Sequence, residues 1–192
     1  MPDMSTEQSG APTAQGTVPQ SEILTSEDIR ALIGQCSEAP TGVRNRSLIL
    51  VMCQEGLRLS EALALSPDHV NLYNSKITIE GSRVLSLDWS TRDQLFRWME
   101  LRKKLGLDSA DVLFCTLKGG VLSPAYVRQL LPRLAEQAGV RKRVHANGLR
   151  DAYAAELLAT GLSKEVIRTR LGYNSRRSLI RYVRQLSGGW QS

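Results

Sequence analysis

Apolar residues recur at helical spacing along most of this chain, and each such stretch stops at a glycine, a proline or a polar turn. This spacing places the apolar side chains on one face of a helix, which can then be buried in a core. Thr25 and Ser123 are suitable N-terminal caps, and Gly56 and Gly139 are suitable helix ends. The pattern predicts helices at residues 25–37, 43–55, 60–65, 90–105, 123–138, 148–160, 163–171 and 176–186.

The period changes from that of a helix to that of a strand near the middle of the chain. Residues 76–79 and 84–87 are short β-favouring runs joined by the turn sequence EGSR, which predicts a small hairpin. A further short strand is predicted at 112–114. We therefore expect an α+β domain that is mostly helical, with a small β-hairpin or sheet at one edge.

The two ends of the chain differ from its middle. Residues 1–20 are rich in Ser, Thr, Gly, Pro and Gln, so burial of apolar surface cannot offset the entropy lost on ordering. We expect a disordered tail at 1–20, a domain at 21–187 and a short tail at 188–192. The longest apolar run, 48–53, is too short to span a bilayer, and no signal peptide precedes it. We therefore expect a protein that is neither secreted nor inserted in a membrane.

The cysteines are sparse and widely spaced. Cys36, Cys53 and Cys115 form no CxxC pair, and the chain contains 2 histidines. This usage predicts buried, reduced thiols in the cytoplasm rather than disulfides or a metal site. No cofactor is expected.

The charge is distributed unevenly along the chain. Residues 1–100 carry 8 Lys and Arg against 13 Asp and Glu, whereas residues 101–192 carry 17 against 6. A basic half favours a polyanion as partner, because Lys and Arg bound to phosphates release condensed counterions. The alternative is a solvated basic surface with no partner.

Three side chains in this basic half suit phosphoryl chemistry. The guanidinium of Arg150 can bind two phosphate oxygens and stabilise the charge that develops on them. Tyr173 and Tyr182 lie in the same basic half, and a tyrosine can attack phosphorus when nearby cations favour its phenolate.

Four sequence motifs follow one another in a fixed order over more than a hundred residues. They are GLRLSEALAL at 56–65, HANGLRD at 145–151, LGYNS at 171–175, and Tyr182, nine residues after Tyr173. In this order and spacing they resemble the catalytic domain of the tyrosine recombinases, or phage integrases. The family usually has H-P-H-x-L-R-H at the second motif and L-G-H-x-S at the third. The resemblance covers about residues 21–188.

The resemblance implies a DNA breaking and rejoining enzyme acting on double-stranded DNA. Tyr182 would attack a phosphodiester and form a 3′-phosphotyrosine bond, and Arg58 and Arg150 would clamp the scissile phosphate. No metal, ATP or small-molecule substrate would be needed. The protein would act as a homo-oligomer on DNA or with a partner recombinase.

The chain departs from the family pattern at three catalytic positions. Ser82, or its neighbour Arg83, occupies the position of a lysine that protonates the leaving 5′-oxygen. Asn147 and Tyr173 each replace a histidine. Serine and asparagine do not transfer protons at neutral pH as lysine and histidine do.

Further basic residues are expected to bind the DNA backbone. They are Arg141, Lys142, Arg143, Arg176 and Arg177.

These departures leave three interpretations open. The first is a site-specific recombinase with reduced activity. The second is a catalytically inactive, recombinase-derived DNA-binding regulator or accessory protein. The third is a relaxase-like nicking enzyme.

For the individual residues, simpler structural roles also remain open. Arg58 and Arg150 could serve only to position DNA, and Tyr182 could pack against the core. Asn147 could be a helix cap, and His145 is expected to be structural.

Overall fold

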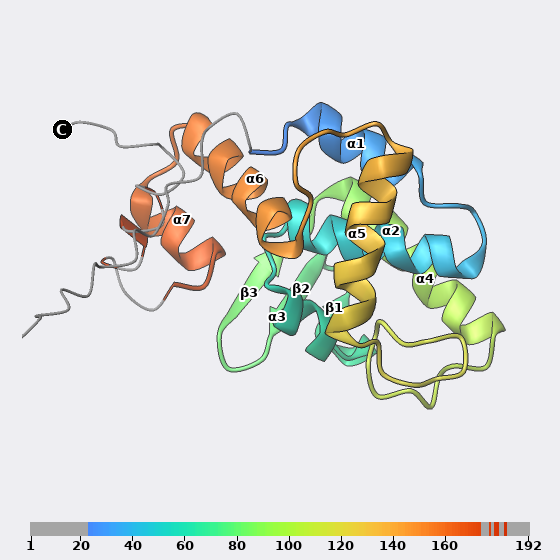
Figure 1. The fold of residues 1–192 in the computed structure, drawn as a ribbon. Coiled ribbons are helices and arrows are strands. Elements are labelled where there is room, and N and C mark those ends of the chain that lie inside the picture. The colour runs from blue at the N-terminus through green and yellow to red at the C-terminus, as the bar shows by residue number, and fades with distance from the viewer. Residues whose placement is uncertain (1–22, 174–176, 178, 181–182, 184–192) are drawn as a thin grey trace, which may run out of the picture.

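The computed structural model describes residues 23–173, 177, 179–180 and 183. Tyr182, Arg176 and both predicted tails lie outside these residues, as does most of the predicted helix at 176–186. The helices are α1 (Ser26–Gly34), α2 (Pro40–Cys53), α3 (Leu59–Ala64), the 3-10 turn η2 (Pro67–His69), α4 (Trp89–Lys104), α5 (Pro124–Gln137), α6 (Ala146–Ala159) and α7 (Lys164–Arg170). The strands are β1 (Val70–Asn71), β2 (Lys76–Ile79) and β3 (Arg83–Ser86). Figure 1 shows their arrangement. The predicted fold class, mostly helical with a small sheet at one edge, is confirmed.

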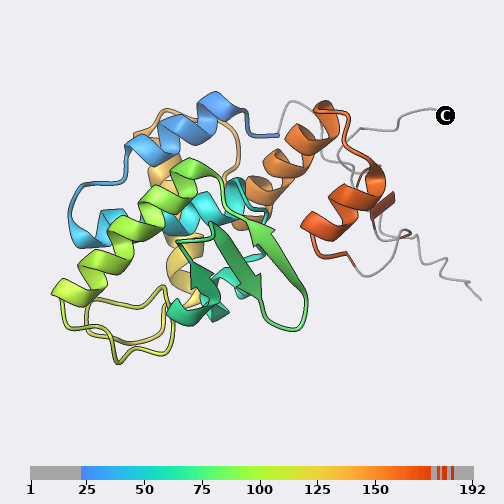
Figure 2. The ribbon, with the colours of Figure 1, turned by 180° about the vertical axis from the view of Figure 1, so that it is seen from behind.

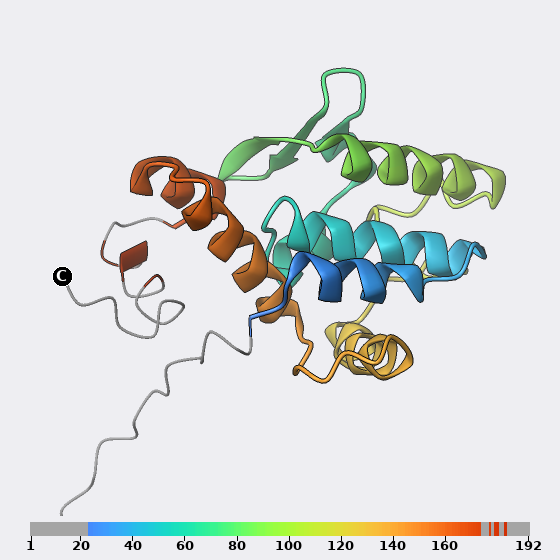
Figure 3. The same cartoon turned by 90° about the horizontal axis from the view of Figure 1, so that it is seen from above.

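Helix α2 forms the centre of the molecule. The run from Leu48 to Cys53 is buried on all sides, as expected for a helix enclosed by other elements. Helix α2 contacts α4 and α6 most extensively, and Figure 3 shows α4 along one side of it and α1 along the other. Trp98 of α4 and Phe114 are fully buried and fill this core.

Local signals in the sequence set several helix ends. The Thr25 hydroxyl accepts the Asp28 N–H at 3.2 Å, and the Asp28 carboxylate accepts the Thr25 N–H at 2.8 Å, so α1 begins with a capping box. The Ser123 hydroxyl accepts the Tyr126 N–H at 3.2 Å, and Pro124 is the first residue of α5. These two predicted helix starts are confirmed.

The three strands form an antiparallel sheet in the order β1-β2-β3. Lys76 pairs with Ser86 and Ile79 with Arg83, so the predicted hairpin is confirmed with its second strand one residue earlier. Strand β3 contacts α7, and Figure 2 shows the turn between β2 and β3 projecting beyond the sheet. The sequence did not predict β1.

Residues 112–114 form no strand, so the prediction of a strand there is wrong. The Leu113 N–H donates to the carbonyl of Leu65 at 2.6 Å, and the Leu113 carbonyl accepts the indole N–H of Trp98 at 2.9 Å. The backbone N–H and carbonyl of Leu113 therefore have hydrogen-bond partners in Leu65 and Trp98. They do not require a neighbouring strand. The nearby β-pairing is a single bridge between Cys115 and Val121.

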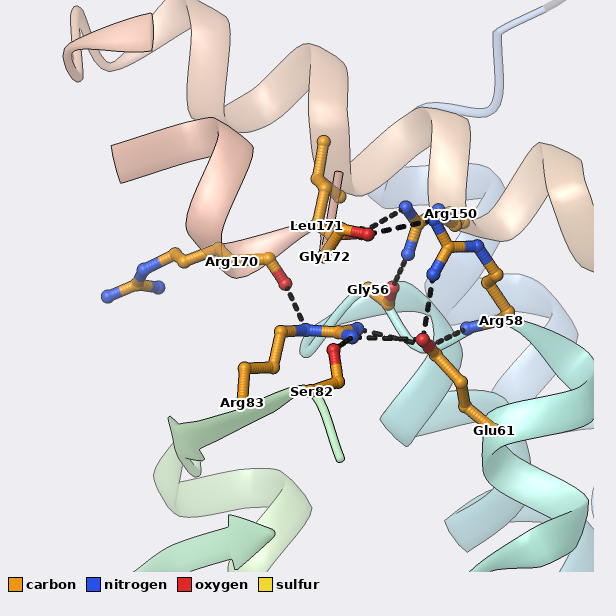
Figure 4. Close-up of polar contacts among 9 residues, drawn as sticks. All are labelled: Gly56, Arg58, Glu61, Ser82, Arg83, Arg150, Arg170, Leu171 and Gly172. Carbon is orange, nitrogen blue, oxygen red and sulfur yellow. Dashed lines mark hydrogen bonds and ion pairs between the residues drawn. The ribbon is translucent and has the colours of Figure 1, made fainter. Parts of the chain in front are cut away.

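A second, smaller hydrophobic cluster lies beside the main core. It consists of Tyr153, Ala154, Leu157, Ile167, Leu171 and Leu179. This cluster joins α6 to α7 and thereby places the C-terminal end of α7 next to α3 and the hairpin (Figures 1 and 4). Among the described helices, none combines the length and the apolar character needed to cross a membrane.

Candidate active site

Arg58 lies where the chain enters α3. Gly56 has a φ of 67° and turns the chain at the end of α2, so that Arg58 immediately precedes the helix. The Nη1 of Arg58 donates to Glu61 Oε1 at 2.8 Å, and its Nη2 donates to the carbonyl of Gly172 at 3.1 Å. The Arg58 side chain is 39% exposed, so part of the guanidinium still faces solvent.

Arg150 lies on the first half of α6 and is buried. Its Nη1 donates to the carbonyl of Gly56 and its Nη2 to the carbonyl of Leu171. Residue 56 follows α2 and residue 171 follows α7, so Arg150 joins two segments that are far apart in sequence (Figure 4). Two backbone carbonyls therefore hold the guanidinium in place.

The ring of Tyr173 lies against both guanidinium groups. The guanidinium carbon of Arg58 is 5.6 Å from the ring centroid, and that of Arg150 is 5.3 Å away. Both distances are in the range of cation–π interactions. The Tyr173 ring therefore helps to hold the two positive charges close together. The three side chains line a cavity of about 480 Å³. Its remaining lining residues are Leu59, Ser60, Asn147 and Asp151.

Asn147 is exposed at the start of α6. It is not the cap of that helix, so its interpretation as a cap is wrong. The cap is His145, whose Nδ1 accepts the Gly148 N–H at 2.9 Å. The structural role expected for His145 is therefore confirmed, and α6 begins two residues earlier than predicted because the imidazole caps it.

Glu61 is the residue of this region to which the sequence analysis gave no role. Its carboxylate accepts Nη1 of Arg83 at 2.9 Å and Nη2 at 3.0 Å, in addition to its bonds with Arg58. Burial acts to raise the pKa of Glu61, but hydrogen bonds from Arg83 and the Arg58 amide, with both positive charges, lower that pKa to about 2. An acid three residues after Arg58 at a helix start is the sequence signal that could have identified it.

Arg83 and Ser82 differ sharply in their surroundings. The Arg83 side chain is 4% exposed and lies between Glu61 and the end of α7. Ser82 is exposed in the hairpin turn, and its Oγ accepts Nη1 of Arg83 at 3.2 Å. Of the two candidates for the lysine position, only the arginine enters the interior next to the cavity.

The predicted DNA-binding residues fall into two groups. Arg141, Arg143 and Arg177 are exposed. Lys142 instead forms an ion pair with Asp28 at 2.7 Å and donates to the carbonyl of Ile23 at 3.0 Å, which ties the loop before α6 to the start of α1.

Comparisons with known proteins give consistent matches. The family model described as Phage integrase family matches residues 22–187. Type 1 fimbriae regulatory protein FimE of Escherichia coli strain K12 is 28% identical over 166 residues, which is 83% of this chain and 84% of FimE.

Solved structures match the fold. The crystal structure of XerA recombinase has a TM-score of 0.77 at 21% identity, covering 91% of this chain and 61% of the XerA chain. XerH site-specific recombinase, in a pre-cleavage complex with its difH substrate, has a TM-score of 0.72 at 25% identity, covering 89% of this chain and 53% of the XerH chain. The chain therefore spans little more than half the length of these two recombinases.

Proposed function

Because this chain belongs to the phage integrase family, the tyrosine recombinases, we propose that it cuts and rejoins double-stranded DNA at specific sites. The observation that carries the proposal is the convergence of Arg58, Arg150 and Tyr173 on one cavity (Figure 4 draws both arginines). XerH, a structural neighbour at 25% identity, is a site-specific recombinase bound to its difH substrate, which supports the choice of substrate.

In the proposed reaction the scissile phosphate occupies this cavity. Arg58, which keeps an exposed face, binds one non-bridging oxygen. Arg150, held by two carbonyls, is already oriented and loses little freedom when the phosphate arrives. Both charges stabilise the additional negative charge of the transition state.

Tyr182 is the proposed nucleophile. The phenol loses its proton to solvent, its oxygen forms a bond to phosphorus while the bond from phosphorus to the 5′-oxygen breaks, and the leaving oxygen takes up a proton from water. The product is a 3′-phosphotyrosine bond and a free 5′-hydroxyl. Attack by the 5′-hydroxyl of another strand reverses these steps and rejoins the DNA.

In the proposed reaction, proton transfer is the slow step. Asn147 and Tyr173 occupy positions where the family usually has histidine, and a lost proton-transfer group costs about 10²- to 10⁴-fold in rate. The Tyr173 hydroxyl can still offer a hydrogen bond to a phosphate oxygen. We therefore propose cleavage at a reduced rate.

The proposed setting is the cytoplasm, with the protein acting as a homo-oligomer on DNA or beside a partner recombinase. Cys36, Cys53 and Cys115 are buried free thiols, which suits a reducing compartment.

A second candidate function is DNA binding without chemistry. The cavity lining favours it, because its titratable members are arginines, an aspartate and a tyrosine, none of which matches the imidazole that the family uses. The protein would then be a DNA-binding regulator or a partner of a complete recombinase.

A covalent-trapping experiment separates these functions. The probe is a pool of duplexes of randomised sequence, each nicked so that cleavage releases a short strand and prevents rejoining. We expect wild-type protein to form a denaturation-resistant adduct with DNA and the Tyr182→Phe variant to form none. DNA binding by both proteins without any adduct would reject the recombinase and support the second candidate.

A further inference from the structure

Three arginines from different parts of the fold converge on one turn. Arg83 Nε donates to the carbonyl of Arg170 at 2.8 Å, Arg150 to that of Leu171, and Arg58 to that of Gly172 at 3.1 Å (Figure 4). These are consecutive carbonyls at the C-terminal end of α7, where the helix dipole is negative and attracts cations. The turn at residues 170–172 is thus a common anchor for the two proposed phosphate-binding arginines and Arg83.

Arg83 is the buried member that the proposed chemistry does not use. Its donors are engaged by the Arg170 carbonyl, both oxygens of Glu61 and the hydroxyl of Ser82. A guanidinium stays protonated in proteins, which makes it a poor proton donor. Since its side chain is 4% exposed, Arg83 does not present its charge to a DNA strand at the surface.

Gly172 fits closely against this guanidinium. Its φ is 60°, a conformation that favours glycine, and a Cβ added there would overlap Nη1 of Arg83 and lie 2.8 Å from its Cζ. The turn is therefore in direct contact with the Arg83 side chain. It is also the turn that leads into Tyr173.

We propose that Arg83 is a positioning residue for the reaction, and that it does not protonate the leaving 5′-oxygen. It connects Glu61 on α3 to the end of α7, and so fixes the turn on which Arg58, Arg150 and Tyr173 depend. This inference rests on the proposed recombinase function for its kinetic consequence. The contacts by which Arg83 holds the turn at residues 170–172 do not depend on whether the protein cleaves DNA.

The kinetic test replaces the bridging 5′-oxygen at the cleavage site by sulfur. A thiolate leaves without a proton, because a thiol is far more acidic than an alcohol. Removing a proton donor would slow cleavage of the oxygen substrate and leave the sulfur substrate nearly unaffected. Removing a positioning residue slows both. We expect Arg83→Gln to slow cleavage of the two substrates by a similar factor, on the order of 10²-fold for a misplaced phosphate clamp. Normal cleavage of the sulfur substrate by Arg83→Gln would overturn the proposal.

The structural test is hydrogen exchange without DNA. The amides of Leu171, Gly172 and Tyr173 are bonded to carbonyls of α7, so they report on opening of the turn. We expect them to exchange at least several-fold faster in Arg83→Gln, with α2 amides unchanged as evidence of an intact core. Exchange at wild-type rates in this turn would overturn the proposal even if cleavage were impaired.

Two further variants complete the design. Gly172→Ala displaces the guanidinium without removing it, and should accelerate the same amides if Arg83→Gln proves too unstable to study. Arg97→Gln is the matched control, because Arg97 also pairs with a glutamate, Glu38 at 2.7 Å, but on an exposed surface. It should change neither exchange in the turn nor cleavage. If wild-type protein forms no adduct at all, the recombinase function fails, while the exchange rates still decide whether Arg83 holds the turn.

Discussion

Glu61 binds Arg83 through both carboxylate oxygens, at 2.9 and 3.0 Å, and this pair links the start of α3 to the first residue of β3. The same carboxylate accepts Nη1 of Arg58 at 2.8 Å. One partly buried negative charge is therefore shared by two positive ones, which offsets the cost of removing Arg83 from water. The proposed phosphate site depends on this shared ion pair as well as on the arginines themselves.

Stability at acid pH should report this ion pair. The pKa of Glu61 is lowered from 4.5 to about 2, so its contribution is complete above pH 4.5 and is lost as the pH falls toward 2. Across that interval wild-type protein should lose stability on the order of 2 kcal/mol from this group. Urea denaturation at several pH values should show a shallower acid loss for Glu61→Gln. Exposed Glu136→Gln is the control, and an acid loss in Glu61→Gln as steep as in wild type would contradict the assignment.

The two phosphate-clamp arginines should differ in their effect on stability. Arg150→Gln leaves two carbonyls without their donor in a buried position, and should lower the free energy of unfolding by about 2–3 kcal/mol. Arg58→Gln removes a partly exposed ion pair and should cost about 1 kcal/mol or less. Both variants should lose adduct formation. Chemical denaturation measures the free energy of unfolding of each variant. Equal losses of stability in Arg150→Gln and Arg58→Gln would argue against the different roles of the two side chains.

Gly56→Ala should be strongly destabilising. A Cβ at this position would lie 2.5 Å from Cδ1 of Tyr153 and 3.1 Å from Cδ2 of Leu171, and the φ of 67° adds strain. We expect a loss of about 2–4 kcal/mol from strain and overpacking together. Gly139→Ala is the matched control, because its φ is 68° but nothing lies within 4 Å of its added Cβ. It should show the strain alone, and similar losses for the two variants would disprove the packing argument.

Salt dependence of DNA binding should distinguish the members of the basic cluster formed by Arg141, Lys142 and Arg143. Arg141→Ala and Arg143→Ala remove exposed charges, so each should reduce the slope of log affinity against log salt by about 1 if it contacts a phosphate. Lys142→Ala should mainly reduce stability, because its ammonium is already paired with Asp28. Fluorescence anisotropy with a labelled duplex at several salt concentrations measures these slopes. A normal slope for Arg141→Ala and Arg143→Ala would exclude this cluster from the DNA interface.

The fold could be predicted largely because local signals coincide with the elements. The Thr25 and Ser123 caps and the buried run 48–53 each act within a few residues. The failure at 112–114 has a non-local cause, since Leu113 is satisfied by Leu65 and Trp98. Strand β1 is two residues long and is defined by its pairing with β2, which leaves almost no pattern in its own sequence.

The candidate site was predictable only in part, for a similar reason. Motif order identified Arg58, Arg150 and Tyr173, which the structure brings to one cavity. It did not reveal that Glu61 joins Arg58 to Arg83, because that contact spans 22 residues between α3 and β3. Spacing alone also could not choose between Ser82 and Arg83, since adjacent residues on a hairpin point in different directions.

Identification of the DNA-linked residue shows whether Tyr182 is the nucleophile. The adduct from the nicked duplex pool is digested with protease and nuclease, and the peptide that retains a nucleotide is sequenced by mass spectrometry. We expect a 3′-phosphotyrosine on Tyr182, absent in Tyr182→Phe and still formed, though more slowly, in Tyr173→Phe. A nucleotide on Tyr173, or no adduct under conditions in which the protein binds DNA, would contradict this assignment.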